Sequence, residues 1–512
     1  MKRSLSVRSL LAGVLVLAAC SKQGAGEADI AEVAPETVPV LAMVELPSGL
    51  SLGSAAQVLD AVQPGASVQA TAAIPIMLTS MAEVGSLNGA DLAKPIRALV
   101  LDPKQHPRPV LLLVSVRDAE QLGQAVGAER LLVRKDLALI GAPEAAKVAH
   151  DYAFGTLARR QAPDSPRATV YAQPLLASFR ADIDVLKTQM GAMMAMAGAG
   201  SDAMTKMLTL YIDSLLAVAE QSERVEMRFA SQDALSGVEL TVHARPGTTL
   251  AGFNQAQAPG DLGLIEMLPA DVEQGAPILV MAGSVAMGPA REAHAHMGDS
   301  ILATLSGPEA GEELRGWMGP FMDLFTGRFA AVVTGMSITP QMIQLIETSD
   351  SAQAASLSRQ LMEKFAARRA PLEIAGVKQT IAFTPEAFAH DGVTVMMQQT
   401  TTELPESPDA EMPSSIDSKG YFAGVDGFLG MAMGEEQDMR RLIDAVRSKA
   451  PRLSVDGALA GAVAATRTRK DSAMMFMNLG ALLGGAEGAP QAVIMALGFE
   501  DARMRLFVAA GR

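Results

Sequence analysis

The chain has 512 residues, a formal net charge of −14 at pH 7, 49% hydrophobic residues and 4% aromatic residues. An acidic chain of this kind repels nucleic acid and anionic membrane surfaces, so we expect no nucleic-acid partner. Its single cysteine excludes an intramolecular disulfide, and its length allows about two to four domains with their own cores.

The first 20 residues have the pattern of an export signal. Basic residues at positions 2, 3 and 8 precede an apolar run, residues 10–19, that is too short to span a bilayer as a permanent helix. The run ends in Leu17-Ala18-Ala19-Cys20, which resembles the lipobox of bacterial lipoproteins. The resemblance implies that residues 1–19 are a signal peptide and that Cys20 is lipidated after cleavage. Because Ser21 stands where an aspartate would imply inner-membrane retention, it implies an outer-membrane protein that faces the periplasm.

Residues 20–39 form the predicted anchor segment, a lipidated Cys20 followed by a tether. The tether lacks aromatic residues and has little to bury, so we expect it to be disordered. As a flexible coil it would span about 25 Å. We expect ordered structure to begin near residues 40–46 and to form two units, residues 40–256 and 257–512.

The two units carry the same order of predicted elements. In each, a buried strand (residues 108–116 and 343–348) leads into a helix with an aspartate N-cap, Asp118 or Asp350. An apolar hairpin follows (residues 131–140 and 421–433), and then a helix, a short strand and another helix. Each unit ends in a two-stranded ribbon whose strict alternation predicts one face on a core and the other in water, as at Glu226, Glu239 and His243.

This pattern predicts an α+β fold of two tandem duplicated units, each an antiparallel sheet backed by helices. The element order, in a lipidated chain rich in Ala and Met, also resembles an uncharacterised family of bacterial envelope lipoproteins. That family carries no known catalytic residues to transfer.

The units differ in two predicted insertions. The second contains a further ribbon and a loop rich in Pro and acidic residues, within residues 369–418. The first contains a helical hairpin, because apolar residues recur at three- and four-residue steps over residues 176–193 and 204–218, on either side of a turn at residues 197–200.

The Met-rich hairpin has three interpretations. Its apolar stripe packs on the unit's own sheet, or it forms a docking surface for lipid tails or varied partners, because Met side chains adapt in shape. In the docking interpretation the ligand-binding residues are Met190, Met193, Met194, Met204, Met207 and Tyr211. Soft-metal binding by Met190, Met193, Met194 and Met196 is the third, and the absence of a nearby Cys or His argues against it.

Two polar clusters have simpler interpretations. His294 and His296 point away from each other if their segment is helical, so we expect two solvated histidines and no metal. Arg467, Arg469 and Lys470 could grip an anionic group, but a solvated turn is the favoured interpretation.

The sequence lacks a phosphate-binding glycine loop, a nucleophile elbow and a His-Glu-x-x-His motif. We therefore predict a non-enzymatic lipid-anchored envelope protein, without a cofactor, that binds a lipid, an apolar ligand or an envelope partner. The alternatives are a structural scaffold or spacer in an envelope assembly and, less favoured, a periplasmic hydrolase whose catalytic residues are distant in sequence.

Overall fold

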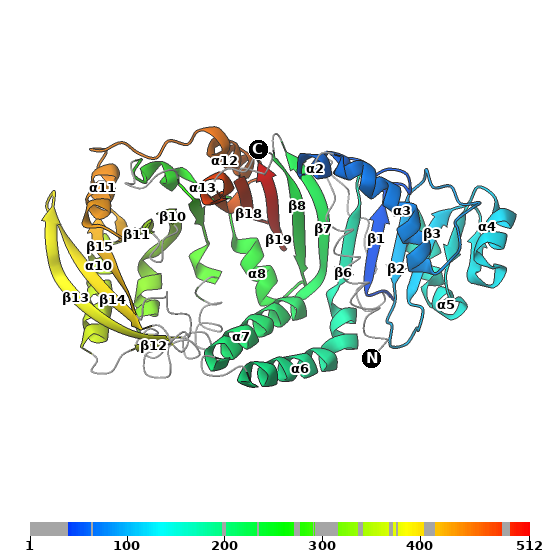
Figure 1. Cartoon of the computed structure of the whole chain (residues 1–512), viewed down its shortest axis with the longest axis horizontal. Coiled ribbons are helices and arrows are strands. Elements are labelled where there is room, and N and C mark those ends of the chain that lie inside the picture. The colour runs from blue at the N-terminus through cyan, green and yellow to red at the C-terminus, as the bar shows by residue number, and fades with distance from the viewer. Residues whose placement is uncertain are drawn as a thin grey trace. The chain divides into compact units, whose positions relative to one another are not determined.

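The computed structural model describes residues 39–62, 65–196, 201–232, 235–270, 277–289, 291, 316–335, 341–367, 372–374, 377–403, 415–483 and 492–511 (Figure 1). The predicted signal peptide, Cys20 and almost all of the predicted tether lie outside these residues. The fold mixes helices with antiparallel strands, which confirms the α+β class. The described residues separate into two compact units: those within 39–183, 218–251 and 502–511 form one, and those within 184–217 and 252–501 form the other.

The first unit is built on an antiparallel sheet whose strand order is β4-β5-β3-β2-β1-β6-β7-β8-β19. Its centre is β1, where Val44 lies opposite Ala98 of β2 and Ala168 of β6. The strands are β1 (Ala42–Leu46), β2 (Ile96–Val100), β3 (Val110–Ser115), β4 (Leu131–Arg134), β5 (Leu137–Ile140), β6 (Arg167–Tyr171), β7 (Ser222–Gln232), β8 (Leu235–Ala244) and β19 (Arg503–Gly511).

Helices cover both faces of this sheet. Because side chains alternate along a strand, Val44 belongs to a core with Ile74 and Leu78 of α3, whereas Met43 belongs to a second core with Ala145 and Ala149 of α5. The helices between residues 55 and 256 are α2 (Ala55–Val62), α3 (Ala66–Ala82), α4 (Ala119–Val126), α5 (Pro143–Asp151), α6 (Ala172–Met196), α7 (Ser201–Glu220) and α8 (Thr249–Ala256). Short helical turns lie at Ala128–Arg130, Tyr152–Thr156 and Leu157–Arg159.

The second unit is also an antiparallel sheet, with the strand order β12-β13-β14-β15-β16-β11-β10-β9-β17-β18. Its strands are β9 (Leu279–Ser284), β10 (Phe325–Gly335), β11 (Gln341–Thr348), β12 (Leu372–Ile374), β13 (Val377–His390), β14 (Val393–Glu403), β15 (Ser415–Val425), β16 (Phe428–Met433), β17 (Asp471–Asn478) and β18 (Ala492–Glu500). Its helices include α10 (Ser351–Ala366), α11 (Glu436–Val446), α12 (Gly457–Thr468) and α13 (Leu479–Leu483), with a helical turn at Gly263–Met267.

The local predictions are confirmed where the structure describes them. Asp118 and Asp350 cap α4 and α10, and each accepts a hydrogen bond from a backbone N–H three residues later, at 3.0 and 2.9 Å. The β15–β16 hairpin turns at Asp426 and Gly427, with φ of 43° and 88°, as a two-residue turn of the I′ type requires. The predicted ribbon of the second insertion is β13–β14, whereas most of its acidic loop lies outside the described residues.

Two features differ from the sequence-based expectations. Strand β19 pairs with β8, so residues 502–511 belong to the first unit in space although the boundary at residues 256 and 257 puts them in the second half of the sequence. Arg469 is only 6% exposed, and its Nε donates to Asp471 Oδ2 at 2.8 Å. The basic cluster is therefore not simply a solvated turn, because a nearby carboxylate neutralises Arg469 within the fold.

Candidate functional site

The helical hairpin α6–α7 begins where the chain enters the first unit. The Tyr171 N–H donates to the Leu41 carbonyl at 2.9 Å, and α6 begins at the next residue, Ala172. The Gln173 side chain then donates to the carbonyls of Glu220 and Ser222, at 3.0 Å each, and so joins the base of α6 to the end of α7.

Lys104, in the loop between β2 and β3, binds the first turns of α6. Its ammonium group donates to the Ser178 carbonyl, forms an ion pair with Asp182 and lies 5.1 Å from the centre of the Phe179 ring. The Ser178 hydroxyl donates to Asp102 Oδ2 at 2.8 Å. Burial would raise the pKa of Asp102, but hydrogen bonds from the Lys104 backbone and Ser178, together with the charge of Lys104, lower it.

Beyond this base, the hairpin exposes large apolar side chains. Val185 and Leu186 on α6 are 54% and 47% exposed, and Tyr211 and Leu215 on α7 are 63% and 53% exposed. An ion pair between Lys187 and Asp213 joins the two helices at this level. The expectation that the stripe packs on its own sheet is therefore wrong for Leu186, Tyr211 and Leu215, because the helices leave these residues in solvent.

The structure describes only part of the predicted binding set. Met190 is half-buried and Tyr211 is exposed. Met193, Met194, Met204 and Met207 have side chains that lie outside the described part of the chain. The four exposed residues Val185, Leu186, Tyr211 and Leu215, called the hairpin surface below, are the part of this candidate site that can be defined. Contiguous exposed apolar groups are typical of a surface that contacts lipid or a partner, whereas single exposed residues, such as Val68 and Ile76 on α3, are common on any protein.

The first unit contains a buried row of charges that the sequence pattern did not predict. Glu45 of β1 is fully buried and binds both of its cross-strand neighbours, Arg97 Nε at 2.9 Å and Arg167 Nε at 3.2 Å. On the next strands, Arg228 Nη2 lies 2.6 Å from Glu239 Oε1, and Glu239 is also fully buried. The alternating pattern wrongly assigned this face of β7 and β8 to water. Opposite charges on neighbouring strands allow the face to be buried, because they neutralise each other.

Glu226 lies at the centre of this row, which we call the charge row. Its Oε1 is 2.7 Å from Arg224 Nε and 3.4 Å from His243 Nε2, and Arg167 Nη1 lies 3.9 Å from its Oε2. Burial alone would raise the pKa of Glu226, but the contacts from His243, Arg224 and Arg167 hold that pKa well below its usual range. Glu226 is therefore ionised in the fold and acts as a counter-ion for the surrounding cations.

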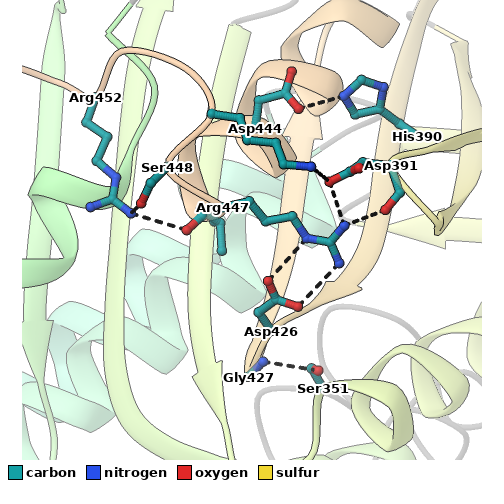
Figure 2. A network of polar contacts seen from close by, with 11 residues as sticks. Ser351, His390, Asp391, Asp426, Gly427, Asp444, Arg447, Ser448 and Arg452 are labelled. Carbon is teal, nitrogen blue, oxygen red and sulfur yellow. Dashed lines mark hydrogen bonds and ion pairs between the residues drawn. The ribbon is translucent and has the colours of Figure 1, made fainter.

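A second polar cluster lies in the second unit, at the end of α11 (Figure 2). Arg447, the residue that ends this helix, bridges two hairpin turns: its Nη1 is 2.8 Å from Asp391 Oδ2, and its Nε is 3.2 Å from Asp426 Oδ2. Lys449 also binds Asp391. Hydrogen bonds from Lys449 and Arg447 lower the pKa of Asp391 from 3.8 to about 2. The cluster ties the turns of β13–β14 and β15–β16 to the helix.

His390 is the histidine of this second cluster, and imidazole is the commonest general base in enzymes. Its Nε2 lies 2.8 Å from Asp444 Oδ1, and its Nδ1 lies 3.1 Å from Arg440 Nη1. The Arg440 guanidinium also stacks 4.4 Å from the centre of the Phe388 ring. Because both ring nitrogens already have a charged partner, and because neither partner is a nucleophile, this arrangement fits a structural ion-pair network better than a catalytic dyad.

Other tests of chemistry give few further candidates. Among the described residues, no group of three or more His, Cys, Asp or Glu side chains is arranged to hold a metal ion. His294 and His296 lie outside the described residues. Within the same described part, no helix has both the length and the apolar composition needed to cross a membrane.

Comparison with known proteins gives no match, because neither a family model, nor a curated protein, nor a solved structure matches the chain.

Proposed function

We propose that the protein is a non-enzymatic, lipid-anchored protein of the bacterial envelope that binds lipid or another apolar partner through its α6–α7 hairpin. The anchor is the lipid on Cys20, and the protein is held at the outer membrane, facing the periplasm. The sequence Leu17-Ala18-Ala19-Cys20-Ser21 supports this location. Stable attachment of an acidic chain takes more than one acyl chain, which a multiply acylated cysteine provides.

The single observation that carries the binding role is the exposure of the hairpin surface. Val185, Leu186, Tyr211 and Leu215 are each about half exposed or more. They lie on two helices that are joined by the Lys187–Asp213 ion pair at this level and by hydrogen bonds from Gln173 at the base. A surface helix normally turns such residues toward a core. An apolar partner would bury them, with Tyr211 suited to a boundary between apolar groups and water.

The absence of catalysis is part of the proposal. In the charge row, Glu45 is buried between Arg97 and Arg167, and Glu239 is buried beside the partly exposed Arg228. The charged groups around His390 are paired with each other. In the described part of the chain, the most unusual ionisable groups therefore stabilise sheets and turns. A hydrolase would need a nucleophile beside a free base.

We also propose that the two units are a tandem duplication. Support comes from matching strand pairs: β1–β2, β1–β6, β2–β3, β3–β5, β4–β5 and β6–β7 correspond in order to β9–β10, β9–β17, β10–β11, β11–β16, β15–β16 and β17–β18. The hairpin α6–α7 then occupies the position that short α13 occupies in the second unit, and β12–β14 are an addition to the second unit. The binding surface would thus be an elaboration of one copy.

The binding role is tested by extracting lipid from a soluble form of the protein. The chain from Ser21 to Arg512, exported with an ordinary cleavable leader, is purified without detergent and extracted with organic solvent. We expect phospholipid to copurify, and a Leu186→Glu/Tyr211→Glu variant to retain about tenfold less, because two buried charges weaken apolar binding by at least 1.4 kcal/mol.

The matched control is Val148→Glu, because Val148 is an apolar residue that is 51% exposed on a different helix, α5. This variant should retain as much lipid as the unchanged chain. Equal lipid in all three proteins, or none in any, would contradict the hairpin as a lipid-binding surface and favour the scaffold alternative.

A further inference from the structure

We propose that the apolar partner of the hairpin surface is the bilayer that carries the protein's own lipid, so that the protein contacts its membrane at two places, Cys20 and α6–α7. This inference rests on the proposed function and names the partner of the same surface. It commits to a phospholipid bilayer, and soluble ligands and protein partners become outcomes of the test.

The chain that follows Cys20 enters the fold beside the start of α6. Residues 21–38 connect Cys20 to Pro39, the first described residue, and β1 begins three residues later at Ala42. The carbonyl of Leu41 accepts from Tyr171, immediately before α6. The chain that follows the lipid-bearing segment therefore enters the fold beside the start of α6, at the base of the hairpin.

The flexible segment that follows Cys20 spans less than the length of the hairpin. Eighteen residues of flexible chain have a root-mean-square span of about 25 Å. Helix α6 has 25 residues, and a helix of that length extends about 37 Å. The anchor thus holds the base of the hairpin closer to the headgroups than the hairpin is long. The hairpin therefore contacts the bilayer in every orientation of the body except those in which the hairpin is directed away from the membrane.

The part of the hairpin that exposes apolar side chains has no net charge. Between Val185 and Leu215 the sequence carries two lysines, Lys187 and Lys206, and two aspartates, Asp202 and Asp213, so this part of the hairpin has no net charge in a chain of −14. The Lys187 and Asp213 charges also neutralise each other directly. The electrostatic repulsion that keeps an acidic body off a membrane is therefore absent where the apolar side chains are exposed.

The hairpin surface is suited to a shallow contact with the bilayer. No described helix is long and apolar enough to cross a membrane, so the hairpin surface suits contact at the interface, where apolar side chains enter by about 5–10 Å. Few apolar residues suffice there, because the lipid on Cys20 makes the second contact intramolecular. Zwitterionic headgroups fit the neutral hairpin best.

The test is a depth measurement on the full lipidated chain in phosphatidylcholine vesicles. The chain has one cysteine, Cys20, and its thiol is consumed by the lipid, so one introduced cysteine can be labelled alone. Leu186→Cys and Tyr211→Cys carry an environment-sensitive fluorophore, and Val148→Cys is the matched control. The vesicles contain acyl chains brominated near the headgroup, which quench a fluorophore that enters the bilayer.

We expect quenching of about twofold at positions 186 and 211, unchanged by 0.5 M salt, and none at position 148. A folding check by circular dichroism accompanies each variant, and Leu215→Cys provides a third position if one of them does not fold. Unquenched labels at two hairpin positions, on protein whose mass confirms the lipid, would overturn the inference. Equal quenching at position 148 would also overturn it, because contact would not be specific to the hairpin.

The lipid extraction described above separates the two proposals. Lipid that copurifies through Leu186 and Tyr211, combined with unquenched labels in vesicles, would leave lipid binding standing and show a bound lipid molecule in place of a bilayer contact. Loss of both signals would reject the hairpin surface altogether.

Discussion

Glu226 shows how strongly single residues in this protein depend on distant partners. Its carboxylate is paired with Arg224 and Arg167 and lies 3.4 Å from His243 Nε2, and these three residues come from three strands. Its position in an alternating sequence predicts a solvated side chain, because neighbouring Val225 and Met227 are apolar. The cations on adjacent strands decide its burial, and sequence alternation alone carries no information about them. The same holds for Glu239, which is fully buried while Val238 and Leu240 beside it are only half-buried.

Glu226→Gln should therefore destabilise the first unit by about 1.5–3 kcal/mol, because it removes the nearer carboxylate partner of Arg224 and one of the two carboxylates beside Arg167. The matched control is Glu223→Gln, since Glu223 also binds Arg224, at 3.3 Å, but is less buried. We expect the control to cost at most about 1 kcal/mol. Hydrogen exchange of peptides from β6 to β8 is the measurement, and similar exchange in both variants would contradict the assigned role of Glu226.

Asp391 gives a prediction of acid sensitivity in the second unit. Because Lys449 and Arg447 lower its pKa from 3.8 to about 2, the carboxylate stabilises the fold above pH 3.8, and this contribution is lost as the pH falls from 3.8 through 2. The urea midpoints of the unchanged protein and of Asp391→Asn should differ at pH 5 and converge toward pH 2. A constant difference across this range would contradict the ion pairs of Figure 2.

At the scale of elements, the sequence predicts most of what is local. Turns and caps depend on residues within a few positions of each other, as at Asp118, Asp350 and the Asp426-Gly427 turn. The hairpin α6–α7 is also predicted, because its period of three and four residues is a property of the helix itself. What its apolar face contacts is a tertiary property, and the sequence wrongly favours the sheet because such faces usually cover a core.

The cap of α10 can be tested separately from packing. Asp350→Ala should destabilise the second unit by about 1 kcal/mol, whereas Asp350→Asn should cost little, because asparagine caps a helix about as well as aspartate. The only tryptophan, Trp317, packs in the same core as Ala354 of α10, so its fluorescence in urea reports on this unit. An equal loss of stability in the two variants would mean that the charge of Asp350, and not its hydrogen bond to Gln353, is what matters.

At the scale of the whole molecule, an α+β fold follows from the order of strands and helices, and the strand pairs support the proposed duplication. The pairing of the last strand, β19, with β8 could not be predicted from the sequence. It joins residues more than 250 positions apart, as in Leu240 opposite Leu506. Such pairing leaves no local signal in the sequence. The proposed role of the molecule combines an anchor read from the sequence with an apolar surface that only the structure defines.

The most direct test of the central claim is the intact mass of the N-terminal peptide, together with the membrane fraction in which the protein is found. The account predicts a peptide that begins at Cys20, carries acyl chains and comes from the outer membrane. The chain exported from Ser21 with an ordinary leader should instead be released into the soluble periplasmic fraction or be held there only weakly through the hairpin. An unmodified Cys20 in a soluble protein would contradict the account, since neither the anchor nor the two-point contact with the membrane could then exist.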